Sequence, residues 1–306
     1  MANRAHFSDL LTPGFREIYD NNFSEVPMQL EKLFHVNTSE KADERDSSVS
    51  DFGLAREVQE ETPIPYEDPI QGYDKTYTHL KYGLGYKVSQ EAYDDDLYRI
   101  FNKKPARLGR AMNRTAEDLA SQQFNNAFST SAVSTLGPDG LPLASTVHTR
   151  SDGGSTQSNA SATGLTFNET NLETAIIAMR KQLDEKGQKI NIYPKKIIVP
   201  VELRKTAHQI VDSPARSGTA DNDVNVYKNQ FEIIDWLYLT STTAWFLVDP
   251  SAHQLNWFWR KRPALKQDEL FDTEVGVWKS TMRVSRGNSD WRGFWGSKGD
   301  GAAYSS

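Results

Sequence analysis

The sequence has no cysteine, so disulfide bonds, thiolate catalysis and cysteine-based zinc sites are excluded. It also lacks any run of eighteen or more apolar residues, the signature of a membrane-spanning helix. The opening residues, MANRAHFSDLLTPGF, have neither the apolar core nor the small-residue cleavage site of a secretory signal. We therefore expect a chain that is not secreted.

Excess charge is small, because 35 Lys and Arg stand against 41 Asp and Glu, a net charge of −6. Proteins whose main task is to grip phosphate backbones obtain that affinity from an excess of Lys and Arg. This balance argues against such a task for the chain as a whole. A mildly acidic wall can nevertheless enclose DNA without adhering to it.

Catalytic motifs are missing as well. There is no G-x-S-x-G, no phosphate-binding loop and no Rossmann glycine triplet. The six histidines, at positions 6, 35, 79, 148, 208 and 253, are too scattered to indicate a ligand cluster. We predict no catalytic residue, no bound cofactor and no metal site, and hence a protein that is not an enzyme.

Three groups of residues come nearest to a functional site. The first fits four positions of an EF-hand loop, but Val226 stands where the loop needs glycine, so an ordinary polar loop is favoured: Asp221, Asp223, Asn225 and Glu232. His148 and Asp152 are four residues apart in a stretch rich in Gly, Ser and Thr. No helix is expected there to bring them together, so a packing or surface histidine is favoured.

The third group is a basic cluster beside aromatic residues, formed by Trp257, Phe258, Trp259, Arg260, Lys261 and Arg262. Such a cluster can stack on nucleic-acid bases. At this net charge we favour a strand end with its aromatic side chains inward and its charges at a subunit boundary.

The N-terminal third is expected to lack a core of its own. An amphipathic stretch from Phe15 to Phe34, broken at Pro27, precedes the polar segment NTSEKADERDSSVSD, which cannot bury enough surface to order itself. This is either a frayed terminus or an arm that orders on another subunit. If it is an arm, removing residues 1–50 should leave a soluble core but prevent stable shells. Further on, KTYTHLKYGLGYKVS alternates as strands do, and prolines 63, 65 and 69 exclude a central strand before it. We expect a two-stranded ribbon that needs outside support.

The remainder predicts an α+β fold. An amphipathic helix follows Pro105, with one face formed by Leu108, Met112, Thr115, Leu119 and Phe124. A long loop covers 134–165, and a second helix has capping-box spacing at Thr170 and Glu173, with Gly187 to end it. The strand KKIIVP leads into a helix over VELRKTAHQIV, and FEIIDWLYL and AWFLVDP are strands, the latter covered on both faces. Long strands in LNWFWRKRP and TEVGVWKSTMRVSRG complete the chain.

The ordered series of these segments resembles the major capsid (head) proteins of tailed bacteriophages. It runs from DGLPLASTVHTRSDGGSTQSNASATGL through LETAIIAMRKQLDEKG and YPKKIIVPVELRKTAHQIVDS to NQFEIIDWLYL, AWFLVDP and EVGVWKSTMRVSRGNSDWRG. The likeness covers about residues 90–296 in motif and the first 90 in layout. It implies an N-terminal arm (1–50), a hairpin called the E-loop (51–93), a peripheral domain with a spine helix (94–190), an axial domain (191–254), and return strands with a C-terminal tail (255–306).

The resemblance also implies a function. Such a chain self-assembles into hexamers and pentamers of an icosahedral head that encloses double-stranded DNA, with which its contacts are non-specific. Scaffolding, portal and decoration proteins would be its partners, and it would be found in the virion after assembly in the host cytoplasm. The long N-terminal scaffolding region of some members has no counterpart here. Some members crosslink the E-loop, and although Lys75, Lys81 and Lys87 are available, nothing marks one as reactive.

Two alternatives remain open from the sequence. An encapsulin-type nanocompartment would keep the fold and enclose enzymes in place of DNA. An enzyme with a site in the 134–165 loop, built around His148, would be a monomer or small oligomer with a ligand pocket.

Overall fold

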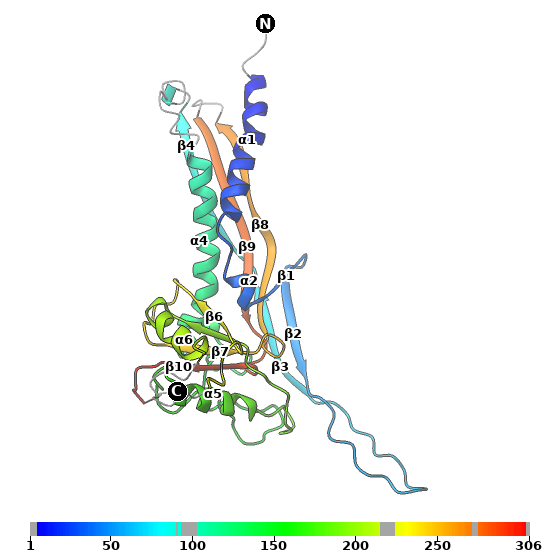
Figure 1. The fold of residues 1–306 in the computed structure, drawn as a ribbon. Helices are drawn as coiled ribbons and strands as arrows, with labels where there is room; N and C mark the ends of the chain where they lie inside the picture. The colour runs from blue at the N-terminus through cyan, green and yellow to red at the C-terminus, as the bar shows by residue number, and fades with distance from the viewer. Residues whose placement is uncertain (1–4, 90, 93–102, 215–223, 271–274, 304–306) are drawn as a thin grey trace. The chain divides into compact units, whose positions relative to one another are not determined.

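The computed structural model describes residues 5–89, 91–92, 103–214, 224–270 and 275–303 (Figure 1). The chain divides into two compact units, which are described separately. The first unit comprises Met1–Glu44, Tyr77–Ala120 and Trp257–Arg286. The second comprises Arg45–Thr76, Ser121–Asn256 and Gly287–Ser306. Each unit is therefore assembled from three separate stretches of sequence.

The first unit is built on a four-stranded sheet. Its strands lie in the order β1-β8-β9-β4, with β1 at His35–Thr38, β8 at Leu255–Leu270, β9 at Val275–Asn288 and β4 at Leu80–Ser89. β4 and β9 are antiparallel and stay in register from Leu80–Val284 to Ser89–Val275. The alternating pattern of the tyrosine-rich segment does form strands, and both long C-terminal strands are confirmed.

Two helices run along this sheet, α1 (Ala5–Ser24) and α4 (Lys104–Asn125) (Figure 1). They approach closely at Gly109, where an added Cβ would lie 2.6 Å from the backbone oxygen of Tyr19. Asn113 Nδ2 donates to the Phe23 oxygen at 2.7 Å and ties the end of α1 to α4. Tyr19 and Ser280 share a 2.6 Å hydrogen bond that fixes α1 to β9.

The predicted apolar face of α4 is confirmed. Leu108, Met112, Leu119 and Phe124 are buried, whereas Thr115 is half-buried and bonds to the Ala111 oxygen. The break at Pro27 is confirmed too, since α1 ends at Ser24 and the short α2 spans Leu30–Leu33. The acidic run Asp94–Asp96, which by sequence can cap a helix, lies outside the described residues.

The second unit contains a four-stranded sheet in the order β10-β7-β5-β6. Its strands are β10 (Phe294–Ser297), β7 (Trp245–Val248), β5 (Lys196–Val199) and β6 (Glu232–Asp235). β5 pairs parallel with β6 and antiparallel with β7. Every residue of β7 is buried, which confirms that this strand is covered on both faces.

Different side chains cover the two faces of that sheet. On one face Trp245 and Leu247 pack with α5 (Glu169–Arg180) and α6 (Arg204–Val211), and the short helix η3 (Val201–Leu203) leads into α6. On the other face Phe246 and Phe294 contact the ring of Phe124. The unit thus has two apolar layers, one aliphatic and tryptophan-rich, the other mainly of phenylalanine.

The ends of α5 differ from the sequence-based expectation. Asn168, and not Thr170, caps the helix, because its Oδ1 accepts from the Asn171 backbone N–H at 2.8 Å. Glu173 accepts a hydrogen bond from the Tyr227 hydroxyl at 2.8 Å in place of completing a capping box. The helix ends at Arg180, and Gly187, with a φ of 76°, serves a later turn.

The polar segment around residue 45 is more ordered than its composition predicts. β2 (Asp43–Val49) pairs with β3 (Gln71–Thr78) in a two-stranded sheet. Backbone hydrogen bonds between strands supply the order that the side chains cannot, so the expectation of disorder there is wrong. The ribbon also differs in its pairing, since β3 and β4 flank His79 but belong to different sheets.

Candidate functional residues and surfaces

His148, around which an enzymatic site in the 134–165 loop was considered, is a buried packing residue. Its Nδ1 lies 2.6 Å from Asp139 Oδ2, its Nε2 lies 3.1 Å from Asn159 Oδ1, and its ring stacks on Trp291 with centroids 4.5 Å apart. Only 1% of the His148 side chain is exposed. No solvent-facing nitrogen is left to act on a substrate.

The hydrogen bonds of Asn159 determine that its side-chain oxygen, and not its nitrogen, faces His148 Nε2. Its Nδ2 donates to the Leu143 oxygen at 2.7 Å, and its Oδ1 accepts from the Ser145 backbone N–H at 2.8 Å. Both ring nitrogens of His148 therefore face oxygen acceptors. The buried polar cluster joins the start, middle and end of the 134–165 loop, which explains how a segment without regular strands or a long helix holds one conformation.

Asp152 does not meet His148. It pairs with Arg150 and accepts from the Gly154 backbone N–H at 2.8 Å, and that hydrogen bond is the chief reason its pKa is lowered. Nearby, Arg292 Nη1 lies 2.7 Å from Glu185 Oε1. Burial acts to raise the pKa of Glu185, but hydrogen bonds from Ser151 and the charge of Arg292 lower it on balance. These charges hold the loop to the turn after α5.

The EF-hand candidate is only partly described, since Asp221 and Asp223 lie outside the described residues. Asn225 is buried, and its Nδ2 donates to the oxygens of Ile210 and Ser213 at 2.7 and 2.9 Å. Glu232 begins β6 and lies 3.9 Å from Lys196. Asn225 thus closes the C-terminal end of α6. Among the described residues no group of three or more acidic or histidine side chains could hold a metal ion.

In the aromatic and basic cluster of β8 the two tryptophans lie inward and the outermost basic side chains face outward, while a subunit boundary at these charges stays a prediction. Trp257 and Trp259 are buried, and the ring of Phe258 lies 5.0 Å from that of Tyr77. Lys261 and Arg262 are exposed, and the Arg262 guanidinium lies 5.6 Å from the Trp259 ring centre. The aromatic side chains pack within the first unit and are not available as a base-stacking platform.

The three lysines considered for a crosslink have different surroundings. Lys75 Nζ donates to the Leu136 oxygen at 2.5 Å, and burial lowers its pKa. Lys81 and Lys87 are both exposed, and both lie on β4.

His79, between β3 and β4, is a buried histidine that the sequence did not single out. Its Nε2 lies 3.1 Å from Ser39 Oγ and its Nδ1 lies 3.0 Å from Ser285 Oγ. Burial lowers the pKa of this imidazole, aided by the charge of Arg283. The two hydroxyls satisfy a neutral ring. No motif marks the site, because its members come from three distant segments.

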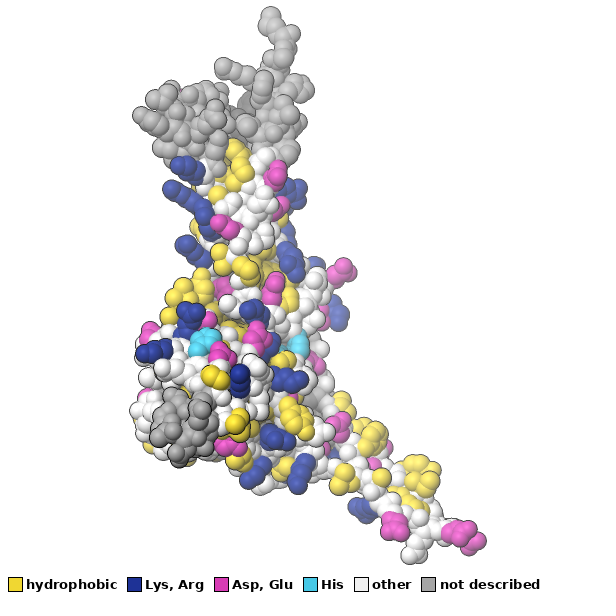
Figure 2. All heavy atoms as spheres, in the orientation of Figure 1, with side chains coloured by type: hydrophobic (Ala, Val, Ile, Leu, Met, Phe, Trp, Pro, Cys, Tyr) yellow, Lys and Arg dark blue, Asp and Glu magenta, His cyan; other side chains and the backbone are white. Residues whose placement is uncertain are grey.

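The segment between β2 and β3 exposes several large apolar side chains. We call residues 50–70 the excursion (Figure 1). At its base the Ser50 N–H donates to the Ile70 oxygen at 2.9 Å, and farther out the Gly53 N–H donates to Glu67 Oε2 at 2.6 Å. The excursion nevertheless exposes large apolar side chains, which Figure 2 shows along it, including Phe52 (67%), Leu54 (81%), Ile64 (67%) and Tyr66 (98%).

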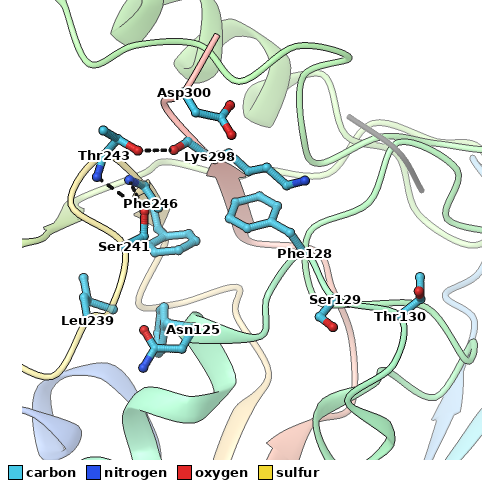
Figure 3. Close-up of a pocket in the computed structure, with 12 residues that line it drawn as sticks. Asn125, Phe128, Ser129, Thr130, Leu239, Ser241, Thr243, Phe246, Lys298 and Asp300 are labelled. Carbon is cyan, nitrogen blue, oxygen red and sulfur yellow. Dashed lines mark hydrogen bonds between the residues drawn. The ribbon is translucent and has the colours of Figure 1, made fainter. Parts of the chain in front are cut away.

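A hollow of about 470 Å³ opens beside the phenylalanine layer of the second unit (Figure 3). Phe128, Phe246 and Lys298 line it, and the Lys298 ammonium lies 6.0 Å from the Phe128 ring centre. Thr243 Oγ1 donates to the Lys298 oxygen at 2.8 Å and fixes one wall. Ser241 Oγ likewise accepts from the backbone N–H groups of Thr243 and Ala244, at 3.4 and 3.1 Å, so these hydroxyls hold the wall of the hollow.

Comparison with known proteins identifies the fold. The capsid of bacteriophage JBD30 is similar with a TM-score of 0.58 at 15% identity, covering 70% of this chain and 92% of that one. The capsid of cyanophage P-SCSP1u gives 0.56 at 12% identity, covering 88% and 87%. A chain of Microbacterium phage Oxtober96 gives 0.55 at 10% identity, covering 88% and 90%. A search of curated proteins gave no match.

At such low identities these structures establish the fold, and the family is established by sequence. The family model described as phage capsid protein matches residues 72–296, which is 225 of the 306 residues. No helix among the described residues is both long and apolar enough to cross a membrane. The chain therefore belongs to the phage capsid protein family and is a major capsid protein, a structural component of the tailed-phage virion.

Proposed function

We propose that this chain assembles into hexamers and pentamers that close into an icosahedral head around double-stranded DNA, and that it does so without catalysing a reaction. Scaffolding, portal and decoration proteins are its further partners, and assembly takes place in the host cytoplasm. The subunit contacts are head-to-tail and close into rings. Interfaces of this obligate kind bury more than about 2,000 Å².

The observation that carries the proposal is the excursion. A soluble monomer rarely exposes so many large apolar side chains on one segment, and such a segment marks a contact with another molecule. The excursion also carries six carboxylates against one basic residue, Arg56. Glu67 pairs with Lys186 of the same subunit at 2.9 Å, but the exposed apolar side chains of the excursion gain a partner when a second copy binds beside it.

In this proposal the parts have distinct roles. Residues 1–50 act as the arm, 94–190 as the peripheral domain with α4 as its spine helix, 191–254 as the axial domain, and 255–306 as the return strands and tail. The sequence-based E-loop, 51–93, includes β4, which pairs along its whole length with β9. We therefore assign the E-loop to β2, the excursion and β3, residues 43–78. The remaining boundaries keep their sequence-based values.

The two alternatives lack comparable support. The family match is to phage capsid proteins, which does not favour an enzyme-packaging nanocompartment. His148, around which an enzymatic site was considered, is buried with both ring nitrogens engaged.

The test is assembly of the purified chain, followed by sedimentation and negative-stain microscopy over a range of protein and salt concentrations. Closed shells, or rings of five and six, are expected. A monodisperse monomer under all conditions, even with a candidate scaffold protein present, would contradict the proposal.

A matched pair of variants sharpens the test. Replacing Phe52, Leu54 and Ile64 with serine should leave the monomer folded and abolish shells. The control replaces Val133, Val224 and Leu237, which are 77%, 81% and 76% exposed outside the excursion, with serine. Equal assembly by the two variants would show that the excursion is not the contact.

A further inference from the structure

A row of positive charges follows the exposed face of α4. Arg107, Arg110 and Arg114 are all exposed, while the residues between them face inward or are small. At 100° per residue the three positions fall within about 60° of one another around the helix axis. Lys103, exposed just before the helix begins, extends the series, and we call these four residues the cationic row.

Few carboxylates oppose these charges. From residue 97 to residue 116 the sequence contains six Lys and Arg and no Asp or Glu. Arg110 lies 3.5 Å from Glu25, a half-exposed pair of the kind that contributes little. Within the part of the chain that the structure describes, the side chains of Arg107 and Arg114 form no hydrogen bond or ion pair. The row thus places three arginines and a lysine ahead of Asp118, the next exposed residue along the same side of α4, on a chain whose net charge is −6.

The chemistry of this face selects its partner. No large apolar side chain is exposed on the described part of α4, so a partner gains nothing there from burying apolar groups. The acidic excursion of another copy carries Phe52, Leu54 and Tyr66, which need an apolar counter-surface. The sheet of the first unit offers one, since Leu80 and Leu84 are each 54% exposed on β4 near its lysines. The α4 face instead suits a polyanion with no apolar side chains.

The spacing of the row suits a phosphate backbone. Arg107 and Arg114 are separated by about 10 Å along the helix, a length over which duplex DNA carries roughly six phosphate charges. Three of the four cations are arginines, whose planar guanidinium groups can bind phosphate oxygens in pairs. Dark blue side chains follow the edge along which α4 runs (Figures 1 and 2).

We propose that the cationic row on α4 is the surface through which this subunit contacts double-stranded DNA, by non-specific binding of phosphates. The inference rests on the proposed function, because it names the surface that the enclosed DNA meets. An otherwise acidic subunit then touches DNA at one place only. Each copy then binds DNA weakly, and the contributions of the many copies in a shell add together.

The experiment measures binding of the full-length subunit to a fluorescent 20-base-pair duplex of mixed sequence, by anisotropy between 20 and 200 mM NaCl. Four phosphate contacts predict a slope of about −3.6 for log K against log salt, or roughly a 150-fold loss of affinity from 50 to 200 mM. Replacing Arg107, Arg110 and Arg114 with glutamine should reduce the slope to about −0.9. The same three positions as lysine should keep the steep slope.

The control changes the same charge elsewhere, replacing Lys81, Lys261 and Lys266 with glutamine on the sheet of the first unit. It should bind the duplex as the unmodified chain does. An equal loss in the two glutamine variants would mean that net charge and not the row determines binding, and would overturn the proposal. So would the absence of duplex binding at 20 mM NaCl.

A labelled peptide of residues 51–70 tests the competing partner. If the row bound this peptide and not the duplex, α4 would be a protein interface and the DNA proposal would fail. Microscopy of the shells formed by each variant distinguishes failure of the DNA proposal from failure of the proposed function. A variant that loses DNA binding and still forms shells bears only on the role of the cationic row.

Discussion

His148 and Asp139 form a buried pair in which Nδ1 lies 2.6 Å from Oδ2 and the two side chains are 1% and 2% exposed. Asp139 also accepts from the Leu141 backbone N–H at 3.1 Å, so it fixes both the histidine and the loop before it. This pair is the centre of the network that orders residues 134–165. The first prediction concerns its removal.

His148→Ala leaves the Asp139 carboxylate buried without its partner, and breaking a buried pair in this way costs about 3 kcal/mol. Urea unfolding should show that loss in the free energy of unfolding. The control, His208→Ala, breaks a pair with Asp212 in which the side chains are 45% and 52% exposed, and should change stability by less than about 1 kcal/mol. Equal effects of the two substitutions would show that burial of the pair is unimportant.

The second prediction concerns acid. Because burial lowers the pKa of His79 below its ordinary value of 6.5, the unfolded chain takes up a proton at that residue more readily than the folded chain. Stability attributable to His79 is therefore complete above pH 6.5 and is lost as pH falls toward the lowered pKa. The charged groups facing it are Arg283 on β9, Arg260 on β8, and Asp43 and Glu44 on β2.

Thermal unfolding between pH 7.5 and 5.5 measures this effect above the range in which carboxylates titrate. The unmodified chain should lose stability over that interval, and His79→Gln should lose less of it. His208→Gln, which changes an exposed histidine, should follow the unmodified chain. Parallel pH curves for all three proteins would contradict the assignment.

The third prediction uses two glycines on helices of the first unit. Gly109→Ala forces a Cβ to within 2.6 Å of the Tyr19 oxygen, so α1 and α4 must separate, at a cost of about 1–3 kcal/mol. Gly14→Ala meets no atom within 4 Å and lies in α1, where alanine should stabilise the helix by about 0.5–1 kcal/mol. Opposite shifts in melting temperature are expected. Shifts of the same sign would show that α1 does not pack on α4 at Gly109.

The fourth prediction revises an expectation from sequence. Deleting residues 1–50 should not leave a soluble core, because Tyr19, Leu30 and Leu33 are completely buried in the first unit. As a point test, Leu33→Ala should cost about 2–5 kcal/mol, whereas Val26→Ala, at a site 59% exposed, should change stability by less than about 0.5 kcal/mol. Soluble, cooperatively unfolding protein from the deletion would refute this.

Sequence patterns were most reliable where one segment determines its own structure. The face of α4 follows from helical periodicity at Leu108, Met112 and Leu119, and the burial of β7 follows from an unbroken apolar run. Partner choice was not predictable in the same way. β3 and β4 alternate alike, yet β3 pairs with β2 and β4 with β9, because register depends on strands that lie far away in sequence.

The same limit applies to the polar sites. The glycine- and serine-rich surroundings of His148 favour a packing or surface histidine, and the structure shows a packing one, but its partner, Asp139, has no recognisable spacing. His79 carried no signal at all, since Ser39 and Ser285 are 40 and 206 residues away from it. The cationic row was readable as spacing in the sequence. Its exposure required the structure.

The excursion also provides a chemical reporter. Arg56 is its single basic residue, and the nearest others, Arg45 and Lys75, lie within the paired strands β2 and β3. Trypsin should therefore nick a free subunit at one place in this region, after Arg56, and spare the same bond wherever a neighbour covers it. The fraction of chains left whole then counts subunits with an occupied contact, in a crude mixture and without any microscope.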